Sequence, residues 1–515
     1  PFRSQRKGII MVMQIDRRSM ILGGAWGIGA LALPAGQALA AELIGARGFT
    51  HAVASGEPGA DSMLLWTRYV PASDAESVRL DVEIAIDPDF ARTVGGGTVR
   101  TGGYRDWTAK VTIDGLQPGT TYWYRFVAPD GSKSPVGRTR TLPQGDVPRF
   151  GLGVFSCSNL PYGWFNAYAH AAADGNFDCV LHLGDYFYEY APGTYPSTDE
   201  TVSGRSVWPS HELVALADYR ARYAAYRQDP DLRRLHQLFP MIAVWDDHES
   251  ANDSWEGGAE NHQPDSEGEW SVRKAAAMKA YREWMPVSDE PWAEYEVGDL
   301  ATLYRLETRL TARAKQFSLG DVLRGGSSPE EAKAALIAFR DGDYKDPARE
   351  LLGSAQQGWL AEGFSRSKAA GKTWQVLVQQ VLMGNLVSSP SLAAALPKDA
   401  PDYIRQRVLA GAMAGAEGVP FSMDAWDGYP AARRRVFEAA LSADANLISL
   451  AGDTHNAWAF DLDLEGTPVG VEFGGQSVTS PGFEGYLPQV PPDVLARDAV
   501  ATNAQLQWMD SSRRG

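Results

Sequence analysis

The chain has 515 residues, 44% hydrophobic and 22% charged, which is typical of a soluble globular protein with room for two or three domains. Its formal net charge of −16 at pH 7 argues against a basic surface for nucleic acid or anionic membranes, so no nucleic-acid partner is expected. Its 2 cysteines, Cys157 and Cys179, exclude a disulfide framework.

The sequence before residue 41 has the pattern of an export signal. Arg17 and Arg18 precede an apolar, Gly/Ala-rich stretch at 21–33, and Ala38-Leu-Ala40 offers a small-x-small cleavage site. The stretch is too short and too glycine-rich to span a membrane, so the mature chain is expected to have no transmembrane segment. Twin arginines are typical of Tat signals, with a Sec signal as the alternative. We assign residues 1–40 to an export signal with upstream residues, cleaved near Ala40. The Tat export machinery is then a partner, and the location is periplasmic or extracellular.

Residues 45–145 have the pattern of a small β-sandwich. Short stretches rich in β-branched and aromatic residues alternate with turns such as Asp114-Gly115. The predicted strands are 62–68, 78–86, 107–113 and 121–127. The segment 116–124 also resembles the corner before a late strand of fibronectin type III domains. We expect a fibronectin III/Ig-like all-β domain without catalytic residues, in which His51 lies at the surface or in a turn.

After Pro148 the pattern changes to alternating strands and helices. Helical periodicity marks the segments 215–227, 272–283, 329–340 and 431–443. This alternation predicts an α/β layered sandwich over residues 148–515. Two long segments rich in Gly, Ser, Asp, Trp and Pro, 191–212 and 249–270, follow strands that end in aspartate. Irregular loops in that position usually cover a site.

Four apolar segments of this second region end in side chains that can bind metals. They are 150–157, ending in Cys157; 179–188, ending in Asp185 and Tyr188; 241–249, ending in Asp247 and His248; and 445–455, ending in Asp453 and His455. In α/β sheets, ligands bind where the carboxyl ends of the strands stop. We therefore expect these side chains to meet in one crevice, as in two-metal hydrolases, whose usual substrate is a phosphoester.

One part of this set favours iron. A phenolate ligand such as Tyr188 favours a hard trivalent ion, above all ferric iron. Cys157 can add a thiolate to that ion, and His455 an imidazole.

The other part is made of carboxylates. Asp185, Asp247 and Asp453 form an oxygen-rich set that suits calcium, magnesium or manganese. Asp185 is the natural bridge, because one carboxylate can bind both ions of a two-metal site. His248 directly follows Asp247 and is expected to donate a proton or a hydrogen bond to the phosphate.

Each motif taken alone has a plainer interpretation. A Gly-Asp pair at a strand end is often a turn, and the segment 246–249 is also compatible with a solvated helix start. Cys179 lies inside an apolar strand, and His182 alternates with the apolar residues of that strand, so we expect Cys179 in the core and His182 in the core or supporting the ligands. The combination of four polar strand ends in one region favours a metal site.

Together these motifs resemble the PhoD-like alkaline phosphatases and phosphodiesterases, a branch of the calcineurin-like metallophosphoesterase superfamily. The resemblance covers essentially all of the mature chain. It rests on the segments 53–58, 65–68, 155–159, 182–189, 245–249, 424–429, 452–456 and 477–482. It implies Fe3+ bound by Cys157, Asp185, Tyr188 and His455. It also implies one or two Ca2+ ions at the neighbouring carboxylates, with Mg, Mn or Zn as alternatives.

Two features depart from the family pattern. Leu306-Glu-Thr-Arg309 stands where many relatives have Leu-Asp-Thr-Arg, a change that is expected to alter only a supporting contact. The chain ends at Gly515, where relatives continue into a final strand and tail, so the C-terminal tail is expected to be incomplete.

We therefore expect an exported binuclear-metal alkaline phosphatase that hydrolyses phosphomonoesters and phosphodiesters by in-line attack of a metal-bound hydroxide. A phospholipase D-like phosphodiesterase would share every ligand, and a non-catalytic calcium-binding secreted protein is the remote alternative. A diesterase needs an apolar wall beside the metals. The aromatic residues expected there are Tyr162, Trp164, Phe165, Tyr186, Trp208, Trp255 and Trp426.

Overall fold

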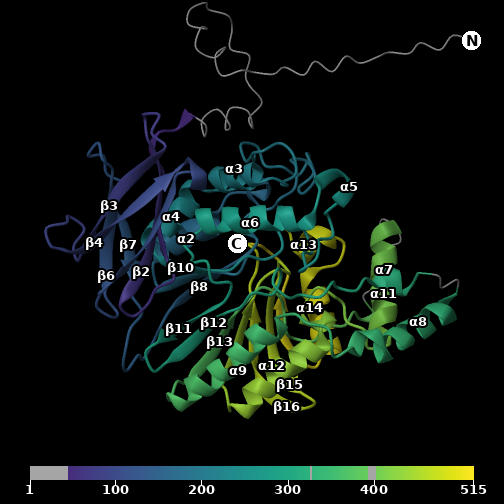
Figure 1. Ribbon diagram of the computed structural model, residues 1–515. Helices are drawn as coiled ribbons and strands as arrows, with labels where there is room; N and C mark the ends of the chain where they lie inside the picture. The colour runs from purple at the N-terminus through teal and green to yellow at the C-terminus, as the bar shows by residue number, and fades with distance from the viewer. Residues whose placement is uncertain (1–44, 325–327, 392–401) are drawn as a thin grey trace, which may run out of the picture. The chain divides into compact units, whose positions relative to one another are not determined.

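The computed structural model describes residues 45–324, 328–391 and 402–515 (Figure 1). The predicted export signal, with Arg17, Arg18 and the cleavage site near Ala40, lies outside the described residues. Within the described ranges, no helix is both long and apolar enough to cross a membrane.

The first part of the described chain is all-β. Its strands are β1 (Gly48–Gly56), β2 (Ser62–Val70), β3 (Ser77–Ala85), β4 (Thr93–Gly102), β5 (Thr108–Asp114), β6 (Thr121–Val127) and β7 (Gly137–Arg140). An antiparallel sheet in the order β4-β3-β6-β7 packs against β5-β2-β1. Leu80, Val82 and Ile84 alternate along β3 into the shared core. The predicted β-sandwich is confirmed. The sequence pattern missed β1, β4 and β7, and β4 is rich in glycine and lacks apolar alternation.

Strand β1 joins this region to the rest of the protein. It pairs with β2 on one side and in parallel with β10 on the other, with Ser55 opposite Pro240. The result is one six-stranded sheet in the order β5-β2-β1-β10-β9-β8. Backbone hydrogen bonds therefore connect the regions before and after residue 145. The division of the chain into two domains near this residue stays a prediction.

The second part contains two stacked sheets. Its strands are β8 (Leu152–Phe155), β9 (Cys179–His182), β10 (Pro240–Ala243), β11 (Ala293–Val297), β12 (Ala301–Arg305), β13 (Trp374–Val378), β14 (Leu447–Ala451), β15 (Ala457–Leu464), β16 (Thr467–Gly474) and β17 (Leu506–Asp510). The second sheet has the order β11-β12-β13-β14-β16-β15-β17. Leu181 and Ile242 of the first sheet meet Leu303 and Val378 of the second in a common apolar layer. The four predicted strand ends thus come from two sheets, with β8, β9 and β10 in one and β14 in the other.

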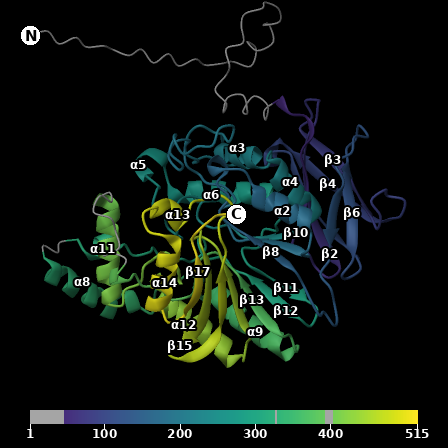
Figure 2. The same cartoon turned by 180° about the vertical axis from the view of Figure 1, so that it is seen from behind.

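Some helices cover the outer faces of both sheets, and others pack on one another to the side of the sheets (Figures 1 and 2). They are α2 (Asn166–Asp174), α3 (Leu216–Tyr226), α4 (Pro230–Leu238), α5 (Pro264–Glu267), α6 (Trp270–Trp284), α7 (Leu319–Val322), α8 (Pro329–Asp341), α9 (Gly353–Ala369), α11 (Asp402–Ala416), α12 (Pro430–Ser442), α13 (Phe483–Tyr486) and α14 (Pro492–Thr502). The helices α2, α3, α4 and α6 pack on the six-stranded sheet, whereas α9, α12 and α14 pack on the seven-stranded one. The four helices predicted from periodicity correspond to α3, α6, α8 and α12. The α/β layered sandwich is confirmed.

The prediction for His51 is wrong. Its side chain is fully buried, with Nε2 lying 3.1 Å from the carbonyl oxygen of Ala224 and its ring edge-on to Trp284. Burial, with the nearby Arg68 and Arg227, lowers the pKa of His51 well below its ordinary value. The cause is tertiary: Ala224 and Trp284 belong to α3 and α6, which no local pattern places over β1.

Candidate metal centre and active site

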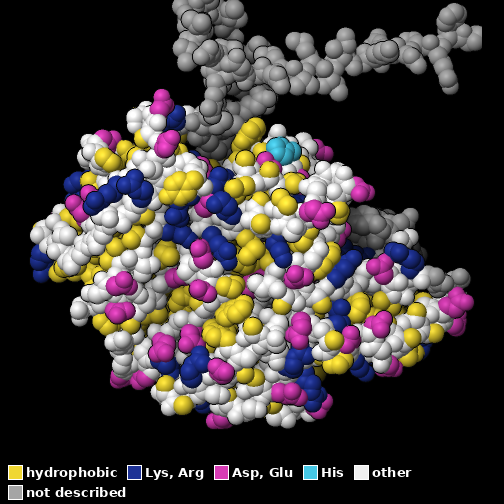
Figure 3. Space-filling model, viewed as in Figure 1, with side chains coloured by type: hydrophobic (Ala, Val, Ile, Leu, Met, Phe, Trp, Pro, Cys, Tyr) yellow, Lys and Arg dark blue, Asp and Glu magenta, His cyan; other side chains and the backbone are white. Residues whose placement is uncertain are grey.

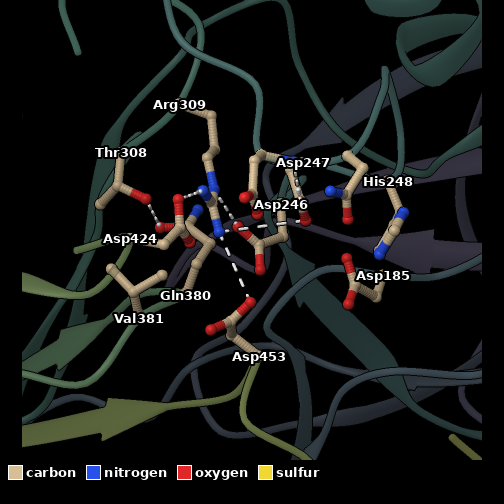
Figure 4. A network of polar contacts seen from close by, with 12 residues as sticks. Asp185, Asp246, Asp247, His248, Thr308, Arg309, Gln380, Val381, Asp424 and Asp453 are labelled. Atoms are coloured by element: carbon tan, nitrogen blue, oxygen red, sulfur yellow. Dashed lines mark hydrogen bonds and ion pairs between the residues drawn. The ribbon is translucent and has the colours of Figure 1, made fainter. Parts of the chain in front are cut away.

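The predicted ligands meet at one edge of the two stacked sheets. Cys157 follows β8, Asp185 follows β9, Asp247 follows β10, and Asp453 and His455 follow β14. Within each sheet these strands run parallel to their neighbours, so their carboxyl ends share an edge. Figure 4 shows Asp185, Asp247 and Asp453 pointing toward a common centre. The donor atoms form three overlapping groups, each with its atoms within 4.8 Å of one another.

The first donor group is made by Cys157, Asp185 and His455. Tyr188 completes it, because its hydroxyl lies 3.2 Å from Asp185 Oδ2 and 3.2 Å from His455 Nε2. The other ring nitrogen of His455, Nδ1, lies 2.8 Å from the carbonyl oxygen of Pro481. A proton on Nδ1 donated to that carbonyl leaves Nε2 free to bind a cation. The structure thus brings together all four residues predicted for the iron site.

The other two groups extend the first through shared carboxylates, Asp185 linking the first group to the second and Asp247 linking the second to the third. One contains Asp185, Asp247 and His248, and the other contains Asp246, Asp247 and Asp453. Asp185 therefore belongs to two groups, as expected for a bridging ligand. Asp246 was not predicted as a site residue, although it directly precedes Asp247.

The backbone at these positions is unusual for the residue types present. Cys157, Asp185, Asp453 and His455 have φ angles of 61°, 51°, 64° and 60°, in the left-handed region. This region costs a non-glycine residue about 1 kcal/mol or more, and such strain clusters at functional sites. Gly184 has a φ of 104°, and a Cβ there would lie 2.3 Å from the Cβ of Asp246. A glycine is therefore required for β9 and β10 to approach so closely.

Glu249 ties the ends of β9 and β10 together. Its buried carboxylate accepts hydrogen bonds from the backbone N–H groups of Asp185 at 3.1 Å, Tyr186 at 2.5 Å and Asp246 at 2.7 Å. The carboxylate of Glu249 is therefore used in hydrogen bonds to the backbone. These bonds fix the position of Asp185 relative to Asp246.

Several carboxylate oxygens of the centre lack a hydrogen-bond partner. Asp185 Oδ1, Asp246 Oδ2 and Asp247 Oδ1 are buried without a hydrogen-bond partner among the described residues. Burial raises the pKa of Asp185 and of Asp453 well above the ordinary value. Uncompensated buried carboxylates are costly, and oxygen-rich sets are what divalent cations prefer. The donor chemistry therefore fits the predicted cations.

The thiol of Cys157 and the phenol of Tyr188, in the first donor group, also need a cation in order to ionise. Burial, followed by the charge of Asp185, raises the pKa of Cys157 and of Tyr188 well above their ordinary values. Without a cation both groups would stay protonated near neutral pH. A bound metal ion deprotonates a coordinating thiol outright, so this pair suits a strongly charged ion.

Arg309 is another residue of the centre that the sequence did not predict (Figure 4). Its fully buried guanidinium donates to Asp246 Oδ1 over 2.5 Å and to Asp424 Oδ1 over 2.7 Å. Its Nη2 lies 3.5 Å from Asp453 Oδ1 and 3.9 Å from Asp247 Oδ1. One fixed cation thus reaches aspartates from three separate segments. The sequence signal that could have identified Arg309 is its position just after β12. Because β12 runs parallel to β13, its carboxyl end lies at the same edge of the sheet.

Glu307 positions Arg309. Its carboxylate accepts hydrogen bonds from the backbone N–H groups of Arg309 at 2.8 Å and Leu310 at 2.7 Å, and from Trp245 Nε1 at 2.8 Å. Glu307 therefore makes a supporting contact, as predicted, and that contact fixes the loop from which the guanidinium enters the centre.

The remaining predictions have mixed outcomes. Cys179 and His182 are buried as expected, with His182 Nε2 lying 2.9 Å from the hydroxyl of Tyr168. The segment 249–270 does reach the centre, since the backbone N–H of Asp253 donates to Asp247 Oδ2 over 2.6 Å. The prediction of an aromatic wall beside the metals was partly wrong, because three of the seven predicted residues lie in the apolar cores. These are Phe165, Tyr186 and Trp426.

Comparisons with known proteins agree with this architecture. A family model described as "PhoD-like phosphatase" matches residues 152–515, and one described as "PhoD-like phosphatase, N-terminal domain" matches residues 36–143. Alkaline phosphatase D of Bacillus subtilis (strain 168) is 34% identical over 457 residues, covering 84% of this chain and 70% of that protein. A solved structure of PhoD superposes with a TM-score of 0.72 at 30% identity, covering 91% of this chain and 84% of that one. The chain therefore belongs to the PhoD-like phosphatase family and is a phosphoric ester hydrolase.

Proposed function

We propose that the enzyme is a binuclear-metal alkaline phosphatase. Cys157, Asp185, Tyr188 and His455 would hold Fe3+. Asp185, Asp247 and Asp453 would hold one or two Ca2+ ions, with Mg, Mn or Zn as alternatives. The observation that carries the proposal is the membership of Asp185 in two donor groups. When bound, such cations activate water and offset the negative charge of the phosphoryl oxygens.

In this proposal His248 is the residue that donates to the phosphate. Burial alone would lower its pKa, but Asp247, Glu189 and Asp185 together raise the pKa of His248 well above the ordinary value. Its Nδ1 lies 2.7 Å from Glu189 Oε2, which orients the ring. Figure 4 shows His248 beside Asp185. A protonated imidazole held there can donate to a phosphoryl or leaving-group oxygen.

The metals are tested by elemental analysis and by colour. Because a phenolate on ferric iron absorbs visible light, the purified enzyme should be coloured and Tyr188→Phe should bleach it. Cys157→Ser should shift the band or lose iron. Cys179→Ser is the matched control, because this cysteine is equally buried but lies in the apolar layer between the sheets. A colourless, iron-free enzyme that is fully active would contradict the assignment.

We propose that both phosphomonoesters and phosphodiesters are substrates. Neither class should be preferred by more than roughly a hundredfold in kcat/KM, about 3 kcal/mol of transition-state binding. Steady-state kinetics on a matched aryl monoester and diester measures this ratio. A far larger ratio toward diesters would favour the phospholipase D-like alternative.

We also propose that the protein is exported through the Tat machinery and takes small phosphoesters rather than nucleic acid. The net charge of −16 disfavours polyanion binding. On the face in Figure 3, Lys and Arg side chains of the described residues are interspersed with Asp and Glu rather than gathered in one field.

A further inference from the structure

Four tyrosines from three segments form a cluster beside Tyr188 and His248. Tyr162 ends the short helix η2 (Leu160–Tyr162), Tyr190 and Tyr195 follow β9, and Tyr486 ends α13. The ring centroid of Tyr195 lies 5.6 Å from that of Tyr188, and the ring of Tyr190 lies 5.4 Å from that of His248. We call Tyr162, Tyr190, Tyr195 and Tyr486 the tyrosine rim.

The members of the tyrosine rim hold one another in place. Tyr195 is the centre, with its ring edge-on to Tyr162 at 5.1 Å and to Tyr190 at 5.8 Å. Its hydroxyl lies 2.7 Å from the hydroxyl of Tyr486, so the loop after β9 is joined to α13. A surface that is already ordered loses little entropy when it binds a ligand.

The rim faces outward rather than into a core. The side chain of Tyr486 is 46% exposed, and the other three rings are half-buried. Beyond α13, Phe421 is 44% exposed and its ring lies 6.1 Å from that of Phe483. Exposed aromatic residues that adjoin one another often mark a binding surface.

The space behind the rim is too small for an organic group. Tyr188, Tyr190 and Tyr195 line a cavity of about 60 Å³. A cavity that binds benzene measures about 150 Å³. An organic group attached to a phosphate at the metal centre would therefore lie against the exposed side of the rings.

We propose that the tyrosine rim binds the organic group of the phosphoester and favours flat aromatic groups over polyols. This inference rests on the proposed function, because it assumes that the phosphate lies beside His248. Ring faces and edges pack well against another ring. A polyol needs several hydrogen-bond partners, whereas the rim offers mainly ring surface, and the hydroxyls of Tyr195 and Tyr486 share one hydrogen bond with each other.

The test compares phenyl phosphate with glycerol phosphate in the full-length enzyme. Tyr486→Leu removes the ring but keeps an apolar side chain, whereas Tyr486→Phe keeps the ring. Trp374→Leu is the matched control, since Trp374 is 41% exposed and begins β13, at the strand end opposite the ligands. Tyr486→Leu should raise KM for phenyl phosphate about tenfold, with a much smaller change in kcat, as expected for lost uniform binding. Its effect on glycerol phosphate should be much smaller, and Tyr486→Phe should raise KM less than Tyr486→Leu.

A second measurement separates the role of the tyrosine rim from the proposed function of the enzyme. Phenylphosphonate, which is not hydrolysed, should inhibit the wild type more strongly than methylphosphonate, and Tyr486→Leu should narrow this difference. Equal effects of Tyr486→Leu on both substrates, no effect on either, or the same effect from Trp374→Leu would overturn the role of the rim. If the wild type hydrolyses neither ester, the proposed function fails. In that case the binding of the two phosphonates, measured as the increase in Tm that each causes, would still decide whether the rim selects aromatic groups.

Discussion

Replacing Arg309 with methionine should strongly destabilise the metal-free protein. The guanidinium is fully buried, and its loss leaves the buried Asp246 carboxyl without its cation, so this group must either stay charged without a partner or take up a proton. Asp424 is affected less, because Arg313 Nη2 lies 2.6 Å from the same Asp424 oxygen. The second oxygen of Asp246 has no hydrogen-bond partner in the described part of the chain, so it cannot compensate.

The magnitude follows from the cost of an uncompensated buried charge. Removing one partner of a buried ion pair typically costs about 3–5 kcal/mol. We expect a loss in this range for Arg309→Met, which corresponds to a drop in Tm of roughly 3–5 °C for a chain of this size. The matched control is Arg324→Met, whose ion pair with Asp321 is 81% and 62% exposed. Exposed pairs contribute about 0–1 kcal/mol, so this variant should unfold almost like the wild type.

The assay is urea and thermal unfolding of chelator-treated protein, followed by tryptophan fluorescence. Asp246→Asn in the Arg309→Met background supplies the decisive comparison, because it removes the orphaned charge. The double variant should recover part of the lost stability. If Arg309→Met is as stable as Arg324→Met, or if adding Asp246→Asn brings no recovery, Arg309 does not stabilise the fold by compensating Asp246.

Further outcomes follow from the same structure. Burial raises the pKa of Glu472 from 4.5 to about 7, so the native state loses stability as the pH rises from about 4.5 through 7. Glu472→Gln should therefore be more stable than the wild type by roughly 3 kcal/mol at pH 8 and similar to it near pH 4.5, measured by urea unfolding; an equal difference at both pH values would contradict this. Asp247→Ala and Asp453→Ala should each weaken calcium binding at least about tenfold in titration calorimetry, and unchanged affinity would remove that residue from the site. Arg17→Lys with Arg18→Lys should leave precursor in the cytoplasm, as detected by fractionation, whereas normal periplasmic accumulation would indicate a Sec route.

The strands and helices after Pro148 could be predicted well from local sequence patterns. Strand β9 is buried on both faces, with Val180 on the helix side and Leu181 on the sheet side, so it is recognisable in the sequence as a short continuous apolar run. The helices α3, α6, α8 and α12 were recognisable by their helical periodicity. The meeting of the candidate ligands could be predicted because α/β sheets bind their ligands at the carboxyl ends of buried parallel strands, where each of these polar residues stands.

The partners of those ligands were decided by the tertiary structure. Arg309 meets Asp246 and Asp424 only because strands far apart in the chain share one edge of the stacked sheets. His51 is buried because helices from another part of the chain cover β1, whose pairing with β10 no local signal predicts. The same holds for the rings at the site: the contact between Tyr195 and Tyr486 spans 291 positions of sequence. Periodicity reports which face of an element is buried, but the identity of the residue packed against it depends on the whole chain.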